Sequence, residues 1–357
     1  MREWSRRDLL KSAAQAVAAW SVLPMADPKA LSPSPGALLP DYRFKTRGVV
    51  IYPEDLSLED WPERAAGACL STIALHHGSA PSHVVAFVKT DKGQAFLEKC
   101  RRLKLEVEYE LHAMRELLPR ALFEKSPEMF RMNDKGERTP DANLCVHSKA
   151  ALEIVAENAV NISAVLKPTT GRHFLWGDDG AAWCRCAKCR ELSDSDQALY
   201  LENHLVRALK SQRSGPNASL AHLAYANTIV PPAKVKPERG VFLEFAPIFR
   251  RYDVPYVEQR EGKDGLGALD ANLAVFPKET AQALEYWLDM SRFSGWKRPV
   301  PPIPWKRDVF LKDLEAYAHR GIRNVTSFAA WIDAEYLKVH GNLGFLQEYG
   351  AGLSGKG

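Results

Sequence analysis

Two adjacent carboxylates, Asp178 and Asp179, follow a short apolar run and precede a group of cysteines. Hydrolysis of a glycosidic bond needs two carboxyl groups: one protonates the leaving oxygen, and the other stabilises or traps the oxocarbenium-like state. Because side chains alternate along a strand, we expect only one aspartate to face a site as the acid, while the other orients a substrate group or caps a loop. An ionised neighbour would raise the proton affinity of that acid. The candidates for the opposing carboxylate are Glu285 and, in reserve, Glu244, which either faces the site or is a buried charge that needs a partner.

Histidines and aromatic residues gather after other apolar runs in the same way. A single polar residue at such a position is commonly a cap, a turn former or a solvated side chain, and the paired histidines could simply bond backbone carbonyls. Together, carboxylates and aromatic walls suit a neutral polyhydroxylated ligand, because sugars offer hydroxyls to carboxylates and apolar ring faces to indole and phenol rings. The indole of Trp296 lies in a proline-rich loop, where it could stack on a sugar or pack that loop. The candidate substrate-binding residues are His76, His77, His112, Tyr225, Tyr286, Trp287, Trp296, Asp333 and Tyr336.

The sharpest local motif is C-x-C-x-x-C, formed by Cys184, Cys186 and Cys189. With Cys145 or His147 as a fourth ligand it could hold a tetrahedral zinc ion, and in an exported protein disulfide bonds are the competing interpretation. A catalytic zinc needs an open position and ligands rich in histidine, so we expect a structural role. That role would be to rigidify the loop that carries the two aspartates. No cofactor is expected for catalysis.

From Arg47 onward, short β-branched or apolar runs alternate with longer segments of helical period, a pattern typical of βα units around a parallel sheet. Eight such runs over about 300 residues predict an α/β protein with a (β/α)8 TIM barrel, whose chemistry lies at the carboxyl ends of the strands. An open doubly wound sheet is the alternative, and the absence of G-x-G-x-x-G and G-x-x-x-x-G-K-S/T argues against its nucleotide-binding forms. The expected strands are Gly48–Tyr52, Ser71–His76, Leu105–Leu111, His173–Trp176, Leu220–Tyr225, Val241–Phe245, Ala283–Leu288 and Asn324–Trp331. The expected helices are about Ser57–Cys69, Lys92–Leu103, Ser148–Leu166, Ser193–Ser211 and Asp308–Arg320.

Residues 1–26 read as a twin-arginine signal peptide, with Arg6-Arg7, an alanine-rich apolar run too short to span a bilayer, and Ala26 before a possible cleavage point. We therefore expect a periplasmic or secreted protein, delivered by the twin-arginine export machinery and without a stable membrane span after cleavage. Residues 27–46 are expected to form a linker, 47–345 a single glycosidase-like barrel and 346–357 a C-terminal tail. The 357-residue chain carries 48 basic and 44 acidic residues, a net charge of +4, which does not argue for a nucleic-acid partner.

The motifs together resemble those of domain-of-unknown-function family 4838 (DUF4838). The resemblance is carried by Leu175–Gly180 with the cysteine motif, by Met132–Arg138 with Leu144-Cys145, and by Leu284–Trp287. Characterised members are endo-β-N-acetylglucosaminidases of glycoside hydrolase family 163, so the resemblance implies a barrel that acts on oligo- or polysaccharides containing N-acetylglucosamine.

Two mechanisms are compatible with that resemblance. By analogy with other barrel glycosidases, Asp179 or Asp178 is the acid and Glu285 the nucleophile. Alternatively, the acetamido group of the substrate attacks, and the two aspartates serve as polariser and acid. The competing functions are a non-catalytic carbohydrate-binding barrel and a metal-dependent hydrolase, although no H-E-x-x-H motif supports the latter.

Overall fold

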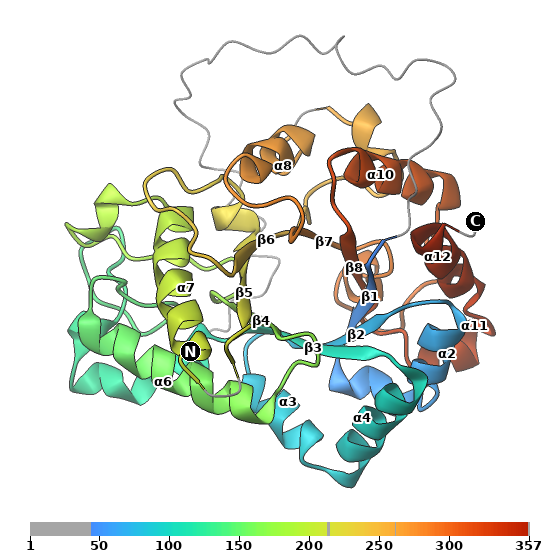
Figure 1. The fold of residues 1–357 in the computed structure, drawn as a ribbon, viewed down its shortest axis with the longest axis horizontal. Helices are drawn as coiled ribbons and strands as arrows, with labels where there is room; N and C mark the ends of the chain where they lie inside the picture. The colour runs from blue at the N-terminus through green and yellow to red at the C-terminus, as the bar shows by residue number, and fades with distance from the viewer. Residues whose placement is uncertain (1–43, 213–214, 261, 356–357) are drawn as a thin grey trace. The chain divides into compact units, whose positions relative to one another are not determined.

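Eight parallel strands form a closed barrel in chain order in the computed structural model, with β8 returning to pair with β1 (Figure 1). The structure describes residues 44–212, 215–260 and 262–355. The strands are β1 Thr46–Ile51, β2 Thr72–His77, β3 Glu106–His112, β4 Arg172–Trp176, β5 Ser219–Ala224, β6 Val241–Phe245, β7 Gln282–Glu285 and β8 Asn324–Phe328. All eight overlap the strands expected from the sequence, so the prediction of a (β/α)8 barrel is confirmed.

Helices encircle this barrel, and α4, α6 and α7 begin at side-chain caps. The hydroxyls of Thr90, Ser148 and Ser193 each accept a hydrogen bond from a backbone N–H in the first helical turn, which satisfies a donor that the helix cannot. The five helices expected from the sequence correspond to α2 Trp61–Gly67, α4 Asp91–Leu103, α6 Lys149–Val165, α7 Asp194–Lys210 and α10 Arg307–His319. Shorter helices that the periodicity did not reveal are α3 Pro81–Val88, α5 Met114–Leu117, α8 Leu266–Leu273, α9 Met290–Phe293, α11 Ala334–His340 and α12 Gly344–Ser354.

The prediction of a C-terminal tail at residues 346–357 is wrong, because helix α12 occupies most of this segment and packs on the barrel. Tyr349 of α12 is fully buried, and its hydroxyl donates a 2.8 Å hydrogen bond to the carbonyl of Gly48 on β1. A Cβ added at Gly350 would lie 1.6 Å from the carbonyl oxygen of Ala68, so only glycine permits this approach to the end of α2. At the other end, β1 begins at Thr46, and the expected signal peptide and residues 27–43 of the linker lie outside the described residues.

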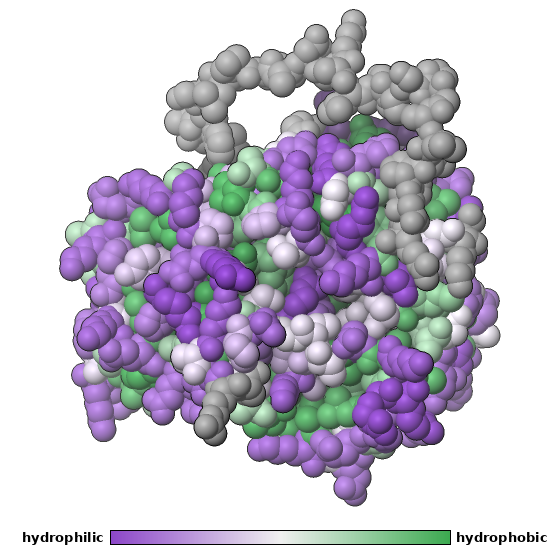
Figure 2. All heavy atoms as spheres, viewed as in Figure 1, coloured by the Kyte–Doolittle hydropathy of each residue, from purple (hydrophilic) through white to green (hydrophobic). Residues whose placement is uncertain are grey.

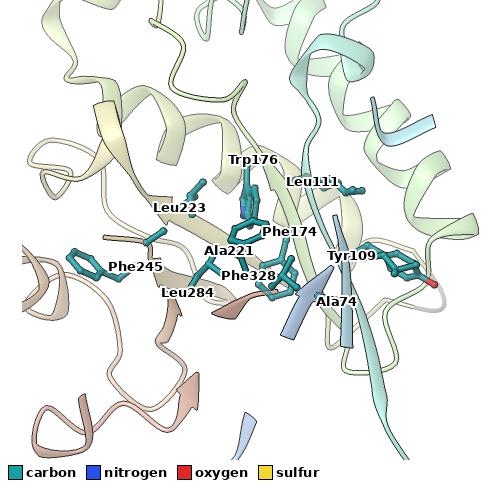
Figure 3. Close-up of a cluster of buried hydrophobic side chains, with 14 of the residues drawn as sticks. Ala74, Tyr109, Leu111, Phe174, Trp176, Ala221, Leu223, Phe245, Leu284 and Phe328 are labelled. Carbon is teal, nitrogen blue, oxygen red and sulfur yellow. The ribbon is translucent and has the colours of Figure 1, made fainter. Parts of the chain in front are cut away.

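Side chains alternate between the barrel interior and the surrounding helices along each strand. On β5, His222 points outward, where its Nδ1 lies 2.7 Å from a carboxylate oxygen of Glu202 on α7. On β4, Phe174 and Trp176 are buried, and Figure 3 shows them in the middle of the hydrophobic cluster, with Tyr109 and Phe245 at its two sides. This alternation decides which strand-end residues can reach a ligand.

The surface seen in Figure 2 is mainly hydrophilic, with hydrophobic residues showing between the polar ones. Within the described part of the chain, the helices are all too short or too polar to cross a membrane.

Candidate active site

Aromatic side chains form a collar at the carboxyl end of the barrel. Each strand except β6 contributes one ring to this collar, at or just after the end of the strand. His76 is its centre: its ring centroid lies 4.9 Å from that of Phe328, 5.2 Å from Tyr52 and 5.9 Å from His112. The Tyr286 ring stacks on Phe328 at 5.3 Å. The members of the aromatic collar are Tyr52, His76, His112, Trp176, Tyr225, Tyr286 and Phe328. Such a wall offers apolar faces with polar edges to a bound ring.

Asp179 is the carboxylate that the structure places beside this collar. Its Oδ1 accepts a 3.1 Å hydrogen bond from the Tyr225 hydroxyl and lies 3.7 Å from His112 Nε2, and its side chain is 17% exposed. His112 donates from Nδ1 to the carbonyl of Gly177 at 2.6 Å, so in the neutral ring Nε2 is an acceptor that faces Asp179. Asp179 is therefore a sheltered but partly exposed carboxyl group, held by the Tyr225 hydroxyl and bordered by His112, and this is a suitable setting for a general acid.

The hydroxyl of Tyr286 also belongs to the surroundings of Asp179. Burial raises the pKa of Tyr286 well above its usual range, and the neighbouring Tyr225 and the Asp179 carboxylate add to that rise. Tyr286 is therefore a neutral hydrogen-bond donor close to the candidate acid. Of the predicted substrate-binding residues, the structure brings His76, His112, Tyr225 and Tyr286 together here.

Asp178, in contrast, is held within the loop. Its two carboxylate oxygens accept hydrogen bonds from the backbone N–H groups of Arg115, at 2.8 Å, and Asn143, at 2.7 Å. Arg120 adds a charge 3.6 Å from Oδ2. Asp178 is therefore a positioning residue, the loop-capping role that we expected for one of the two aspartates, and its neighbour alone faces the collar.

Asn143 fixes the same loop from the other side. Its Oδ1 accepts from Asp178 N at 2.9 Å, and its Nδ2 donates to the carbonyls of Ala181 and Ala182 at 3.2 Å. Its φ of 44° lies in the left-handed region that asparagine tolerates better than most residues. The backbone on both sides of Asp179 is thus tied to one fully buried amide.

We expect Asn143→Ala to destabilise the fold by about 1–3 kcal/mol, because partners of the lost amide are left without a hydrogen bond. Any activity that depends on Asp179 should fall with it. Urea unfolding measures the first effect. Asn158→Ala is the control, since that side chain makes a single hydrogen bond to Leu117 and should cost about 1 kcal/mol or less. Equal losses in the two variants would contradict the role given to Asn143.

Glu244 lies inside the barrel beneath the collar and is fully buried. Its carboxylate accepts hydrogen bonds from Trp176 Nε1 at 2.8 Å and Gln282 Nε2 at 2.9 Å. Burial raises the pKa of both Glu244 and Glu110, and the charge of Glu244 raises that of Glu110 further. Of the two alternatives for Glu244, the structure shows the buried, partnered group: it supports Trp176 from below and does not face the mouth.

Glu285 points outward from β7, so the expectation that it opposes Asp179 across the mouth is wrong. It is fully buried between the barrel and α10, where Arg250 Nη2 lies 3.0 Å from its Oε1 and the Tyr317 hydroxyl donates to the same oxygen. Arg250 also pairs with Asp313 of α10 at 2.7 Å. The strand register turns Glu285 to the helix side and the next residue, Tyr286, to the mouth.

Two aromatic candidates for substrate binding pack the outer layer, which corrects their expected role. Trp287 donates from Nε1 to Asp313 at 3.0 Å and contacts the ring of Phe310. The Tyr336 hydroxyl accepts a hydrogen bond from the backbone N–H of Ile303, and its ring packs against the ring of His340 on the same helix, α11. Both side chains are buried away from the collar.

Of the other three candidates, His77 is the last residue of β2, and Asp333 and Trp296 lie in loops. His77 accepts backbone hydrogen bonds at Nδ1 and lies 3.0 Å from a ring nitrogen of His83, and burial lowers its pKa. Asp333 caps α11 and pairs with Arg298 at 2.6 Å. Trp296 is half-buried in the loop after α9. The His77 ring meets the collar member Tyr52 edge-on, with ring centroids 6.5 Å apart, whereas no contact named here places Asp333 or Trp296 on the collar.

Some residues of the site were absent from our candidates. Tyr52 and Phe328 complete the collar; Tyr52 ends an expected strand, which was a usable signal, whereas Phe328 lies within the expected strand Asn324–Trp331 and ends β8 only in the structure. Asp55 is buried and accepts backbone hydrogen bonds from Tyr52 and Trp331, which ties the β1 loop to the β8 loop. No sequence pattern distinguishes Asp55 or Asn143 from ordinary loop residues.

Four cysteines come together next to the loop that carries Asp179: Cys145, Cys184, Cys186 and Cys189. Their sulfur atoms all lie within 4.8 Å of one another, and all four side chains are buried. The sulfurs are unbonded to one another, and His147 contacts Cys189 without joining the group of sulfurs. The cluster could therefore bind a metal ion, with Cys145 as the fourth ligand.

Solved structures that resemble this chain are barrel glycoside hydrolases. A β-N-acetylhexosaminidase from Bacteroides fragilis NCTC 9343 aligns with a TM-score of 0.54 and 12% identity over 86% of this chain and 66% of its own. The β-galactosidase Gan42B from G. stearothermophilus aligns with a TM-score of 0.55 and 12% identity over 87% of this chain and 57% of its own. A β-galactosidase from Rahnella sp. R3 aligns with a TM-score of 0.52 and 14% identity over 89% of this chain and 57% of its own. The likeness shows a glycosidase-like fold, and this chain spans 57% to 66% of the lengths of these proteins.

A search of curated proteins finds no match. The family model described as "Domain of unknown function (DUF4838)" matches residues 79–340, which include β3 to β8, the Asp179 loop and the four cysteines. The chain therefore belongs to the DUF4838 family, and its (β/α)8 barrel resembles in fold the glycoside hydrolase structures named above.

Proposed function

We propose that this protein is a glycoside hydrolase that cleaves glycans containing N-acetylglucosamine, with Asp179 as its general acid. The observation that carries the proposal is the place of Asp179: at the end of β4, bonded to Tyr225, beside His112 and next to the aromatic collar. A glycosidase needs a carboxyl group that is sheltered enough to stay protonated and exposed enough to reach a leaving oxygen. The collar supplies ring faces on which a sugar can stack.

The choice of an N-acetylated sugar rests on the carboxylates that we considered for the opposing role, which are engaged elsewhere in the part of the chain that the structure describes. Glu285 and Glu244 are fully buried and turned away, while Asp333 and Asp55 are engaged by Arg298 and by backbone N–H groups. A 2-acetamido sugar carries its own nucleophile. Its carbonyl oxygen bonds to C1 as the C1–O bond to the leaving group breaks, and the leaving oxygen takes the Asp179 proton. Water then attacks C1 and gives a proton to the Asp179 carboxylate, while the bond between C1 and the acetamido oxygen breaks and restores the acetamido group.

Hydrolysis of matched substrates tests this proposal. The purified mature chain is expected to release the aglycone from aryl β-N-acetylglucosaminides or to cut N-acetylglucosamine-containing oligosaccharides, and to leave the corresponding glucosides intact. Cleavage of both sugar classes at similar rates would contradict the acetamido mechanism, because a glucoside offers no such nucleophile. An acid–base role for Asp179 would survive that result.

A non-catalytic carbohydrate-binding barrel is the second candidate, and the outward position of Glu285 favours it. In that case the aromatic collar would bind a glycan that is never cut. Isothermal titration with the same oligosaccharides separates the two functions: binding without cleavage after prolonged incubation supports the binding protein.

The proposed chemistry uses only side chains of the mouth and no cofactor. A metal ion at the four cysteines would support the loop and would not enter the reaction, because four sulfur ligands leave no open position.

We also propose export through the twin-arginine pathway, which the Arg6-Arg7 pair and the following apolar run support. N-terminal sequencing of the exported protein tests this, and a mature chain that begins at Asp27 is the expected result. An intact N-terminus in the cytoplasm would contradict it.

A further inference from the structure

The four-cysteine cluster has the dimensions of a tetrahedral metal site. Cys145 Sγ lies 3.8 Å from the sulfurs of both Cys186 and Cys189. Four sulfurs held at about 2.3 Å from one zinc ion lie about 3.8 Å apart, the edge of the corresponding tetrahedron. A disulfide needs sulfurs at about 2.05 Å, so one or two disulfides among these cysteines would collapse one or two edges of that tetrahedron. We propose that Cys145, Cys184, Cys186 and Cys189 bind one structural zinc ion.

Hydrogen bonds onto the sulfurs support thiolates at this site. Cys184 Sγ receives the backbone N–H of Met132 at 3.3 Å, that of Cys186 at 3.5 Å and a guanidinium N–H of Arg138 at 3.6 Å. His147 Nδ1 lies 3.2 Å from Cys189 Sγ, as a donor to a ligand sulfur would. Four thiolates around a divalent ion carry a net charge of −2, and buried charge of that size requires such donors. A neutral thiol at Cys184 would not require three hydrogen-bond donors.

The identity of the metal follows from the ligands. A buried set of four sulfurs selects zinc or iron among the common metals, and a closed tetrahedral site with backbone donors suits zinc without redox chemistry. The cluster contains no carboxylate or water-accessible position, so magnesium and calcium do not fit.

The site joins the two segments that hold the candidate acid. Cys145 follows Asn143 by two residues, and Cys184 follows the buried Trp183, whose ring lies against Gly177. Asn143 in turn grips Asp178 and the backbone just after Asp179. A zinc ion would therefore lock the β3–β4 connection to the loop after β4 and hold the backbone of Asp179 in place.

Metal analysis of the purified mature chain tests the proposal independently of any glycan. One zinc per chain is expected by mass spectrometry of the purified protein, together with six titratable thiols after unfolding in chelator without a reductant. Cys184→Ser and Cys189→Ser should lose most of the zinc. Cys100→Ala should keep it, because Cys100 is an isolated buried thiol on α4. His147→Ala should weaken zinc binding about 10- to 100-fold while the site remains.

Two measurements keep the test decisive if the cysteine variants fail to fold. Zinc released from the unmodified protein by denaturation can be titrated with a chromogenic chelator, and cobalt exchanged into the site should give the visible and sulfur-to-metal bands of a tetrahedral tetrathiolate. Iron in place of zinc, a metal-free protein with fewer than six thiols, or zinc retained by Cys184→Ser would each overturn the proposal. A zinc-loaded protein that cuts no glycan would leave this site intact and contradict only the glycosidase.

Discussion

Asp179→Asn is expected to lower kcat for an unactivated N-acetylglucosaminide by about 10²- to 10⁴-fold, the usual contribution of a general acid. Asparagine keeps the shape of the side chain and can still accept from the Tyr225 hydroxyl, so folding should be unaffected. The deficit should shrink sharply with a dinitrophenyl leaving group, because that group departs without protonation. Steady-state kinetics with the two substrates measure both effects.

Asp270→Asn is the matched control for that experiment. Asp270 is an exposed aspartate on α8 that pairs with Arg320, the residue after α10, at 2.7 Å. Its kinetics should equal those of the unmodified protein. If Asp179→Asn slows both leaving groups equally, Asp179 positions the substrate and is not the proton donor. If it slows neither, the acid lies elsewhere.

The barrel could be predicted from the sequence because the strands are short runs rich in β-branched and apolar residues and they alternate with longer segments of helical period. The expected Val241–Phe245 strand matches β6 to the residue, and the other strands are shifted by a few residues at their ends. Helix α12 could not be predicted in this way: it contains three glycines and has no strong polar face, and its burial depends on a close approach to Ala68.

The candidate site was partly predictable for the same reason. The rule that chemistry follows the strands led to His76, His112, Tyr225 and Tyr286, and strand alternation required that only one of the two aspartates face inward. The prediction that Glu285 faces the mouth was wrong because β7 is only four residues long, and a shift of one residue exchanges the two faces of a strand. The partner of Glu285, Arg250, lies 35 residues away in a loop, and no local sequence pattern predicts that ion pair.

The outward network around Arg250 leads to the largest expected loss of stability. The guanidinium pairs with both Glu285 and Asp313, and all three side chains are at most 1% exposed. Burial already raises the pKa of Glu285, and the charge of Arg250 opposes that rise. Arg250→Met removes the only cation known to contact these two carboxylates in the described structure, so they must be buried without it or be protonated. The free energy of unfolding should fall by about 3–5 kcal/mol, measurable by denaturant titration.

The adjacent residue provides the control, because Arg251 also pairs with an aspartate but in solvent: the side chains of Arg251 and Asp253 are 68% and 59% exposed. Arg251→Met should therefore change stability by about 1 kcal/mol or less. Glu285→Gln distinguishes structure from chemistry at the same site. If Glu285 only anchors Arg250 to β7, the variant loses stability, and the folded fraction keeps its kcat. A fully folded Glu285→Gln protein that has lost its activity would restore Glu285 as the nucleophile and require β7 to present its other face to the mouth.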